Sequence, residues 1–144
     1  MALVGGGGSP NVAGSNPAGT GGSLQYIGDH VYGNSGAITA TNGSDGTLFE
    51  FTTGVSYAIV KFGFGMSNTN VSPNKVFGYK LSINSETVLE NVSISDGDGT
   101  MVFDGASIVQ SILLPSYSTI KIESTTTDTD SITTYGILTG RVYA

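Results

Sequence analysis

Short alternating runs of apolar and polar residues dominate the chain, and the clearest run lies within residues 107–124. An apolar stretch there ends at Pro115, and Ile120 and Ile122 then alternate with polar residues. Successive side chains of a strand point to opposite faces, so this period of two predicts a strand with one face in a core and one in water. Pro115 has no N–H to donate to a sheet, and it therefore predicts a corner of sequence Pro-Ser-Tyr-Ser between two strands.

Similar runs fill the chain from Leu24 onward. The best is 57–66, in which five apolar side chains alternate with Lys61, Gly63 and Gly65. The turn at 42–46 contains two glycines and predicts a hairpin loop. The predicted strands are 24–32, 36–41, 47–53, 57–66, 76–84, 86–95 (with Val88, Val92 and Ile94), 100–103, 107–114, 119–124 and 131–143.

No window keeps a helical period with caps, while Gly, Thr, Val, Ile and aromatic residues are abundant. Many short strands separated by turns indicate an all-β fold, an antiparallel β-sandwich or a barrel. A jelly-roll-like sandwich is the natural version with eight strands, although the pattern alone does not determine the strand order. We therefore predict a jelly-roll-like β-sandwich with an extended Gly-rich N-terminal arm.

The first 23 residues differ in composition from the rest. They contain four consecutive glycines and very few apolar residues, apart from Leu3 and Val4. Such a segment cannot bury enough surface to fold by itself and resembles a flexible linker. We predict an extended arm over 1–23, with Leu3 and Val4 as its anchor, followed by a sandwich domain over 24–144.

The last predicted strand, 131–143, is apolar on both faces. Leu138 and Val142 lie on one face, whereas Tyr135, Ile137 and Tyr143 lie on the other. A strand of this kind is covered on both sides. The second cover is either another subunit or a loop of the same chain.

The charge of the chain excludes some partners. It has 11 Asp and Glu against 5 Lys and Arg, a formal net charge of −6. Affinity for nucleic acid depends mostly on Lys and Arg, so we expect no nucleic-acid partner. Only 11% of the residues are charged, below the roughly 25% of an ordinary soluble domain. This surface indicates either a subunit of an assembly or a soluble Thr-rich β protein.

Other classes are excluded by what the sequence lacks. There is no cysteine, so disulfides and thiol chemistry are ruled out. The first residues have no basic region and only a short apolar run, and no stretch approaches the roughly 18 apolar residues of a membrane span. We expect a protein that is made in a cytoplasm, has no export signal and does not enter membranes.

Asp96, Asp98 and Asp104 are the candidate metal ligands. Their alternating carboxylates resemble a calcium loop, because hard cations prefer oxygen ligands. The EF-hand pattern requires Gly and Glu at the positions of Met101 and Ser107, and Asp-Gly is a common turn sequence. The interpretation adopted is a turn without a metal, and we expect no cofactor.

Catalytic groups are sparse. His30 is the single histidine, and no nucleophile elbow of the G-x-S-x-G type accompanies it. A glycosidase pair could be drawn from Glu50, Glu86, Glu90 or Glu123, but all four lie in strand patterns and none is singled out. We expect no enzymatic activity; a hydrolase would have to lose activity when Glu50, Glu90 or His30 is changed.

Surface aromatic residues provide a further class of candidate site. Tyr57, Tyr117 and Tyr143 fall at positions expected to be exposed, and Trp is absent. Aromatic side chains of this kind serve either a protein interface or a platform for sugars.

Several segments together resemble a known family. They are the Gly-rich leader, LQYIGDHVYGNSG at 24–36, LFEFTTG at 48–54, SILLPSYSTIKI at 111–122 and LTGRVY at 138–143. In this order they resemble the small β-sandwich virion proteins of tailed phages, particularly marine ones, that serve as capsid decoration (cement) or minor capsid proteins. The resemblance covers nearly the whole chain, but its motifs are structural.

The resemblance implies a non-enzymatic, trimeric subunit located in the virion and bound to the outside of an icosahedral shell. Its partners would be further copies of itself and the major capsid protein, and its arm would reach along neighbouring shell subunits. The residues expected to contact partners are Leu3, Val4, Pro10, Pro17, Tyr117 and Tyr143. The alternative is a carbohydrate- or receptor-binding module of a phage tail or fibre.

Overall fold

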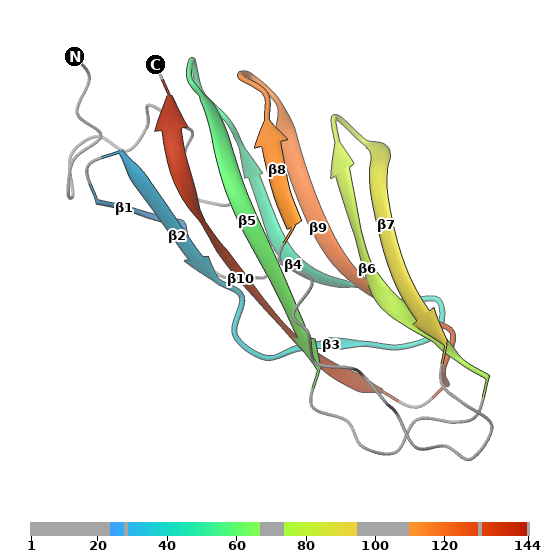
Figure 1. The fold of residues 1–144 in the computed structure, drawn as a ribbon. Coiled ribbons are helices and arrows are strands. Elements are labelled where there is room, and N and C mark those ends of the chain that lie inside the picture. Colours follow the sequence, from blue (N-terminus) through green and yellow to red (C-terminus); the bar gives the residue numbers. More distant parts are fainter. Residues whose placement is uncertain (1–23, 28, 67–73, 95–109, 130, 144) are drawn as a thin grey trace.

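The structure is a computed structural model that describes residues 24–27, 29–66, 74–94, 110–129 and 131–143. These residues form ten β-strands and no helix (Figure 1). No described residue therefore belongs to a helix that could cross a lipid bilayer. The strands are β1 (Leu24–Ile27), β2 (His30–Asn34), β3 (Ile38–Ala40), β4 (Gly46–Thr52), β5 (Tyr57–Met66), β6 (Val76–Ile83), β7 (Glu86–Ile94), β8 (Gln110–Leu114), β9 (Thr119–Thr126) and β10 (Ile132–Tyr143).

The strands form two antiparallel sheets that pack face to face (Figure 1). One sheet has the order β1-β2-β10-β5-β8, with β3 pairing with the start of β10, and the other has the order β4-β9-β6-β7. Apart from the short strands β1 and β3, eight strands remain. Of these, β2 pairs with β10, β4 with β9, β5 with β8 and β6 with β7, so that each pair is nested inside the one before it along the chain. This nested pairing is the strand order of a jelly roll, and the predicted fold class is confirmed.

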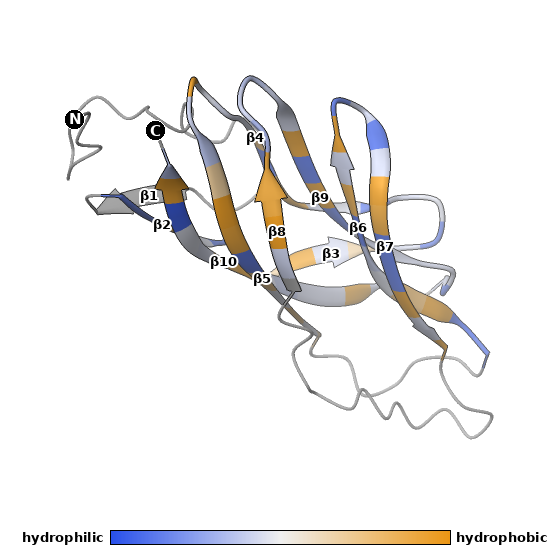
Figure 2. Ribbon diagram, turned by 45° about the horizontal axis from the view of Figure 1, so that its top comes forward, coloured by the Kyte–Doolittle hydropathy of each residue, from blue (hydrophilic) through white to orange (hydrophobic). Residues whose placement is uncertain are grey.

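The core lies between the two sheets and follows from the period of two. Figure 2 shows hydrophobic and hydrophilic residues alternating along the long strands. At the centre, the ring of Phe62 meets Phe49 edge-on at a centroid distance of 6.2 Å and Tyr79 at 4.8 Å. Ile120 and Ile122 are fully buried, as predicted. Aromatic rings from both sheets thus fix the sheets against each other.

Two corners carry the chain between the sheets, and they are joined at one end of the sandwich. The β4–β5 connection contains Thr53, and the β8–β9 connection contains Pro115 and Ser118. The buried hydroxyl of Thr53 donates to the carbonyl of Pro115 at 2.5 Å and accepts from the amide of Ser118 at 2.8 Å. The amide of Tyr117 donates to the carbonyl of Gly54 at 2.9 Å. The predicted corner at Pro115 is confirmed, and it closes the sandwich.

Two predictions of local structure are wrong. The run 24–32 is not one strand, because β1 and β2 form a hairpin in which Ile27 pairs with His30. The alternation of apolar and polar residues could not reveal this, because one long strand and two short paired strands have the same alternation. The turn at 42–46 is not a β-hairpin. Gly43 has a φ of +78° and Thr41 bridges Ser44, but β3 and β4 belong to different sheets. The predicted arm and the predicted strand 100–103 lie outside the described residues.

Candidate functional site

The two outer faces of the sandwich differ in chemistry. The outer face of the β2-β10-β5-β8 sheet carries large apolar and aromatic side chains, and we call it the apolar face. The outer face of the β4-β9-β6-β7 sheet carries ionised side chains, and we call it the charged face. The apolar face consists of Tyr32, Tyr57, Ile59, Leu113, Tyr135, Ile137 and Tyr143, each between 37% and 56% exposed.

The registers of the strands bring the residues of the apolar face together. Ile59 on β5 lies opposite Leu113 on β8, so two aliphatic side chains are neighbours across the strands. Next to them Tyr57 lies opposite Tyr143, and their rings stack at 5.2 Å with an interplanar angle of 10°. The predicted second apolar side of the last strand is confirmed as exposed within the described chain. Ile59 and Leu113 were missed, although each is an apolar residue at a position where its strand pattern calls for a polar one.

A hollow lies in the apolar face between β5 and β10. Gly63 pairs with Ile137, and Gly65 pairs with Tyr135. Gly65 leaves open space beside Tyr135, because a Cβ added there would meet no atom within 4 Å, whereas Cγ2 of Ile137 lies over Gly63, 3.0 Å from the place of an added Cβ. The hollow has a volume of about 330 Å³ and an open mouth. The largest side chains that line this hollow are those of Phe64, Tyr135 and Ile137.

An ion pair lies within the apolar face, because Arg141 is on the central strand β10 between His30 of β2 and Ile59 of β5. Arg141 donates from Nε to Oδ2 of Asp29 at 3.0 Å and also from Nη2 to the same oxygen. These hydrogen bonds lower the pKa of Asp29 below its ordinary value and raise the pKa of Arg141. His30 Nε2 lies 3.5 Å from Asp29 Oδ1, with its side chain 66% exposed. Histidine and aspartate are thus adjacent at the surface.

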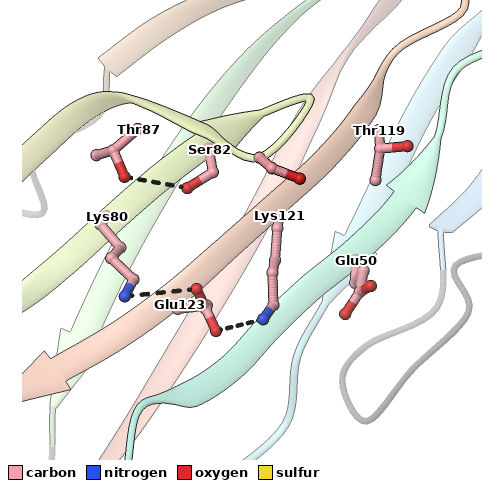
Figure 3. Close-up of a pocket in the computed structure, with 8 residues that line it drawn as sticks. Glu50, Lys80, Ser82, Thr87, Thr119, Lys121 and Glu123 are labelled. Atoms are coloured by element: carbon pink, nitrogen blue, oxygen red, sulfur yellow. Dashed lines mark hydrogen bonds and ion pairs between the residues drawn. The ribbon is translucent and has the colours of Figure 1, made fainter.

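The charged face contains a shallow polar hollow of about 410 Å³ (Figure 3). Glu123 lies between two ammonium groups: its Oε1 is 2.6 Å from Lys121 Nζ, and its Oε2 is 3.7 Å from Lys80 Nζ. Lys80 also pairs with Asp45, and this hydrogen bond is the main cause of the raised pKa of Lys80. Glu50 lines the same hollow together with hydroxyl-bearing residues, namely Ser82, Ser85, Thr87 and Thr119.

The charged hollow presents a dense set of donors and acceptors. Two of the four glutamates considered from the sequence, Glu50 and Glu123, line it, whereas Glu86 and Glu90 lie on β7 and do not. The paired charges of Lys80, Lys121 and Glu123 suit electrostatic recognition of a polar ligand more than proton transfer. Within the described residues, no group of three His, Asp or Glu could hold a metal ion.

A second apolar surface lies on the edge strand β7. Val88, Val92 and Ile94 are 54%, 44% and 68% exposed, and the inward side chain of β7 is that of Leu89. Glu90 lies among them and is also exposed. We call these four exposed residues the β7 strip. The predicted apolar positions of this strand therefore face outward and do not contribute to the core.

Two of the residues predicted to contact partners can be placed. Tyr117 lies at the β8–β9 corner, is 73% exposed and has a φ of +53°. Tyr143 lies on the apolar face and is the last residue of β10, and β10 ends at the same end of the sandwich as the β8–β9 corner (Figure 1). The other predicted contacts, Leu3, Val4, Pro10 and Pro17, lie outside the described residues. So do the candidate metal ligands Asp96, Asp98 and Asp104.

The fold and the two faces define a class of protein: a jelly-roll β-sandwich in which, among the described residues, one sheet face exposes large apolar side chains. This architecture occurs among viral capsid domains, lectins and cupins, and it does not fix a function. Comparisons with protein-family models, with curated proteins and with solved structures found no match for the chain.

Proposed function

We propose that this chain is a structural, non-enzymatic virion protein, a decoration subunit that self-associates and binds the outside of a phage head. The observation that carries the proposal is the apolar face. An exposed apolar sheet face on a folded sandwich is a surface for assembly, because it is stabilised when another protein covers it.

The size of the apolar face supports this role. Seven large side chains that are each 37–56% exposed together present on the order of 500 Å². The largest apolar patch of an ordinary monomer is about 300–600 Å² and is often functional. A specific protein interface buries about 800 Å² on each partner. The apolar face thus supplies most of one side of such an interface.

The composition and the family resemblance point the same way. A Gly-rich segment precedes the sandwich, and extended segments bind partners over long distances without a core of their own. The low charged fraction, 11%, suits a subunit that is surrounded by other proteins. The resemblance to phage decoration proteins supplies the partner, namely the major capsid protein, and the location in the virion.

The test removes the arm. A variant lacking residues 2–22 is expected to keep the folded sandwich, measured by circular dichroism, but to lose binding to shells of the major capsid protein of the same virus. Binding is measured by co-sedimentation with the shells, with the full-length chain as control. Equal occupancy by the truncated and full-length proteins contradicts the role of the arm, and failure of the full-length chain to bind contradicts the decoration function.

A second function is favoured by the charged hollow. Its carboxylates, ammonium groups and hydroxyls could hydrogen-bond a polar ligand such as a glycan, as in a receptor-binding module of a tail or fibre. Binding of the isolated protein to a glycan array with an affinity of about 1 mM or better, lost in Glu123→Ala, would favour this function over decoration. We expect no such binding.

A further inference from the structure

The described part of the molecule has two apolar surfaces on different sheets. One is the apolar face, and the other is the β7 strip on the edge of the opposite sheet. When two identical subunits meet symmetrically, one surface contacts itself. When they meet head to tail, two different surfaces contact each other, and the contact can repeat into a closed ring. A chain with two unlike apolar surfaces has what the second arrangement requires.

The shapes of the two surfaces match. The apolar face has a hollow of about 330 Å³ that is open at Gly65, with Gly63 and Ile137 on its wall. The β7 strip presents Val92 and Ile94, which are 44% and 68% exposed and protrude from an edge strand. Both are β-branched, so few rotamers are lost when they are seated in a hollow.

The charges match as well. Lys61 is exposed on the apolar face. It lies two residues before Gly63 on β5 and therefore on the same side of the sheet. Glu90 is exposed on the β7 strip. Neither forms an ion pair with another described residue, since the ion pairs there join Asp29, Asp45 and Glu123 to other cations. Glu90 lies opposite Lys80 across the strands, but the ammonium of Lys80 is already paired with Asp45 and Glu123. The carboxylate of Glu90 on one surface and the ammonium of Lys61 on the other therefore favour contact between the two surfaces.

We infer that the β7 strip of one copy of the chain seats on the apolar face of the next copy. Val92 and Ile94 enter the hollow, and Glu90 approaches Lys61 of the neighbour. This inference rests on the proposed function, because it specifies the contact by which the decoration subunit self-associates. Repetition of one head-to-tail contact closes a ring, for which the family resemblance implies three copies.

The test uses one charged substitution on each surface of the full-length chain. Ile137→Lys alters the wall of the hollow, and Val92→Lys alters the strip. Val55→Lys is the matched control, because Val55 is an exposed aliphatic residue, 63% exposed, in the β4–β5 corner outside both surfaces. Each protein is checked for folding by its thermal unfolding curve, and its mass is measured by sedimentation velocity, alone and in equimolar mixtures.

The expected result is a ring for the wild-type chain and for Val55→Lys, and monomers for each of the two interface variants. An equimolar mixture of Ile137→Lys and Val92→Lys should form a one-to-one heterodimer, because each variant keeps the surface that the other lacks. A misfolded variant could not form this heterodimer. A Val92→Lys protein that associates like the wild type, a mixture that stays monomeric, or a monomeric wild-type chain would each overturn the inference.

A charge exchange gives an independent readout. Lys61→Glu alone and Glu90→Lys alone should each weaken association at least several-fold, and the double variant should restore it. Additive weakening in the double variant contradicts the pairing. Mass in solution and binding to shells are measured separately. A wild-type chain that is a monomer but still binds shells rejects this contact and leaves the decoration function standing. A chain that forms a ring but never binds shells supports the contact and rejects the decoration function.

Discussion

At the scale of single residues, the packing of β10 depends on the absence of side chains. Gly136 faces the core, and a Cβ added there would lie 2.8 Å from Phe49 Cε2 and 3.2 Å from Phe62 Cε2. The added atom would overlap two buried rings that hold the sheets together. Gly65 lies on the paired strand β5 toward the apolar face, and an added Cβ there meets no atom within 4 Å. An added side chain is therefore excluded by sterics at Gly136 but tolerated at Gly65 on the paired strand.

We predict that Gly136→Ala lowers the free energy of unfolding by about 1–3 kcal/mol, the usual cost of overpacking a close-packed core. Gly65→Ala is the matched control, because it has the same effect on the unfolded chain and fills open space. It should leave stability unchanged or raise it slightly. Gly65 lies in the hollow of the apolar face, so both variants are compared in the Val92→Lys background, which is expected to be monomeric. Urea unfolding of both variants measures the difference. Equal stability of the two variants would contradict this account, because it would mean that the rings of Phe49 and Phe62 leave space for a methyl group at Gly136.

At the scale of elements, the two chain crossings at one end of the sandwich are joined through Thr53. Its side chain is 3% exposed, and its hydroxyl both donates to and accepts from the β8–β9 corner. Because β4 and β9 lie in one sheet and β5 and β8 in the other, this contact fixes both sheets at the same point. The corner that presents Tyr117 therefore depends on a buried hydrogen bond.

We predict that Thr53→Val destabilises the protein by about 1–3 kcal/mol, because the amide of Ser118 loses the acceptor Thr53 Oγ1 and the carbonyl of Pro115 loses the donor Thr53 Oγ1. Thr52→Val is the control. Thr52 is the exposed neighbour, and replacing it should change stability by less than about 0.5 kcal/mol. Thermal unfolding of the two variants provides the measurement, and an equal change in both would show that the hydroxyl of Thr53 does not hold the corners together.

The strands and the core could largely be predicted from the sequence, because a period of two is a local signal. The alternation in 57–66 and the positions of Ile120 and Ile122 were sufficient for these. The connections could not be predicted in the same way. The glycines of 42–46 allow a tight turn, but a turn sequence does not tell whether the next strand pairs back or crosses to the other sheet.

The candidate surfaces could be predicted only in part. Tyr135, Ile137 and Tyr143 are visible as a second apolar side of one strand. Their contact with Gly63 and Tyr57 is set by the register of β10 against β5, which is a long-range property. For the same reason the meeting of Glu50 and Glu123 at the charged hollow was missed. The alternation of residues shows which side of a strand a residue faces, but it does not show which strand pairs with it.

At the scale of the whole molecule, the sandwich divides its surface by chemistry. The ion pairs of the charged face are partly exposed to water, and ion pairs at the surface contribute little to stability. The apolar face lies on the other side of the sandwich, and the β7 strip borders the charged face, because Glu90 lies opposite Lys80. A subunit with this division can join its own copies through the apolar face and the β7 strip and keep the Tyr117 end for other partners.

The central claim is that the chain decorates a phage head, and the most direct test is to locate it on native particles. Virions of the phage that encodes the chain are labelled with gold-conjugated antibody raised against the sandwich and imaged by electron microscopy. The account predicts label distributed over the outer surface of the head at regularly repeated positions. Label confined to the tail or its fibres, or particles without label, would contradict it.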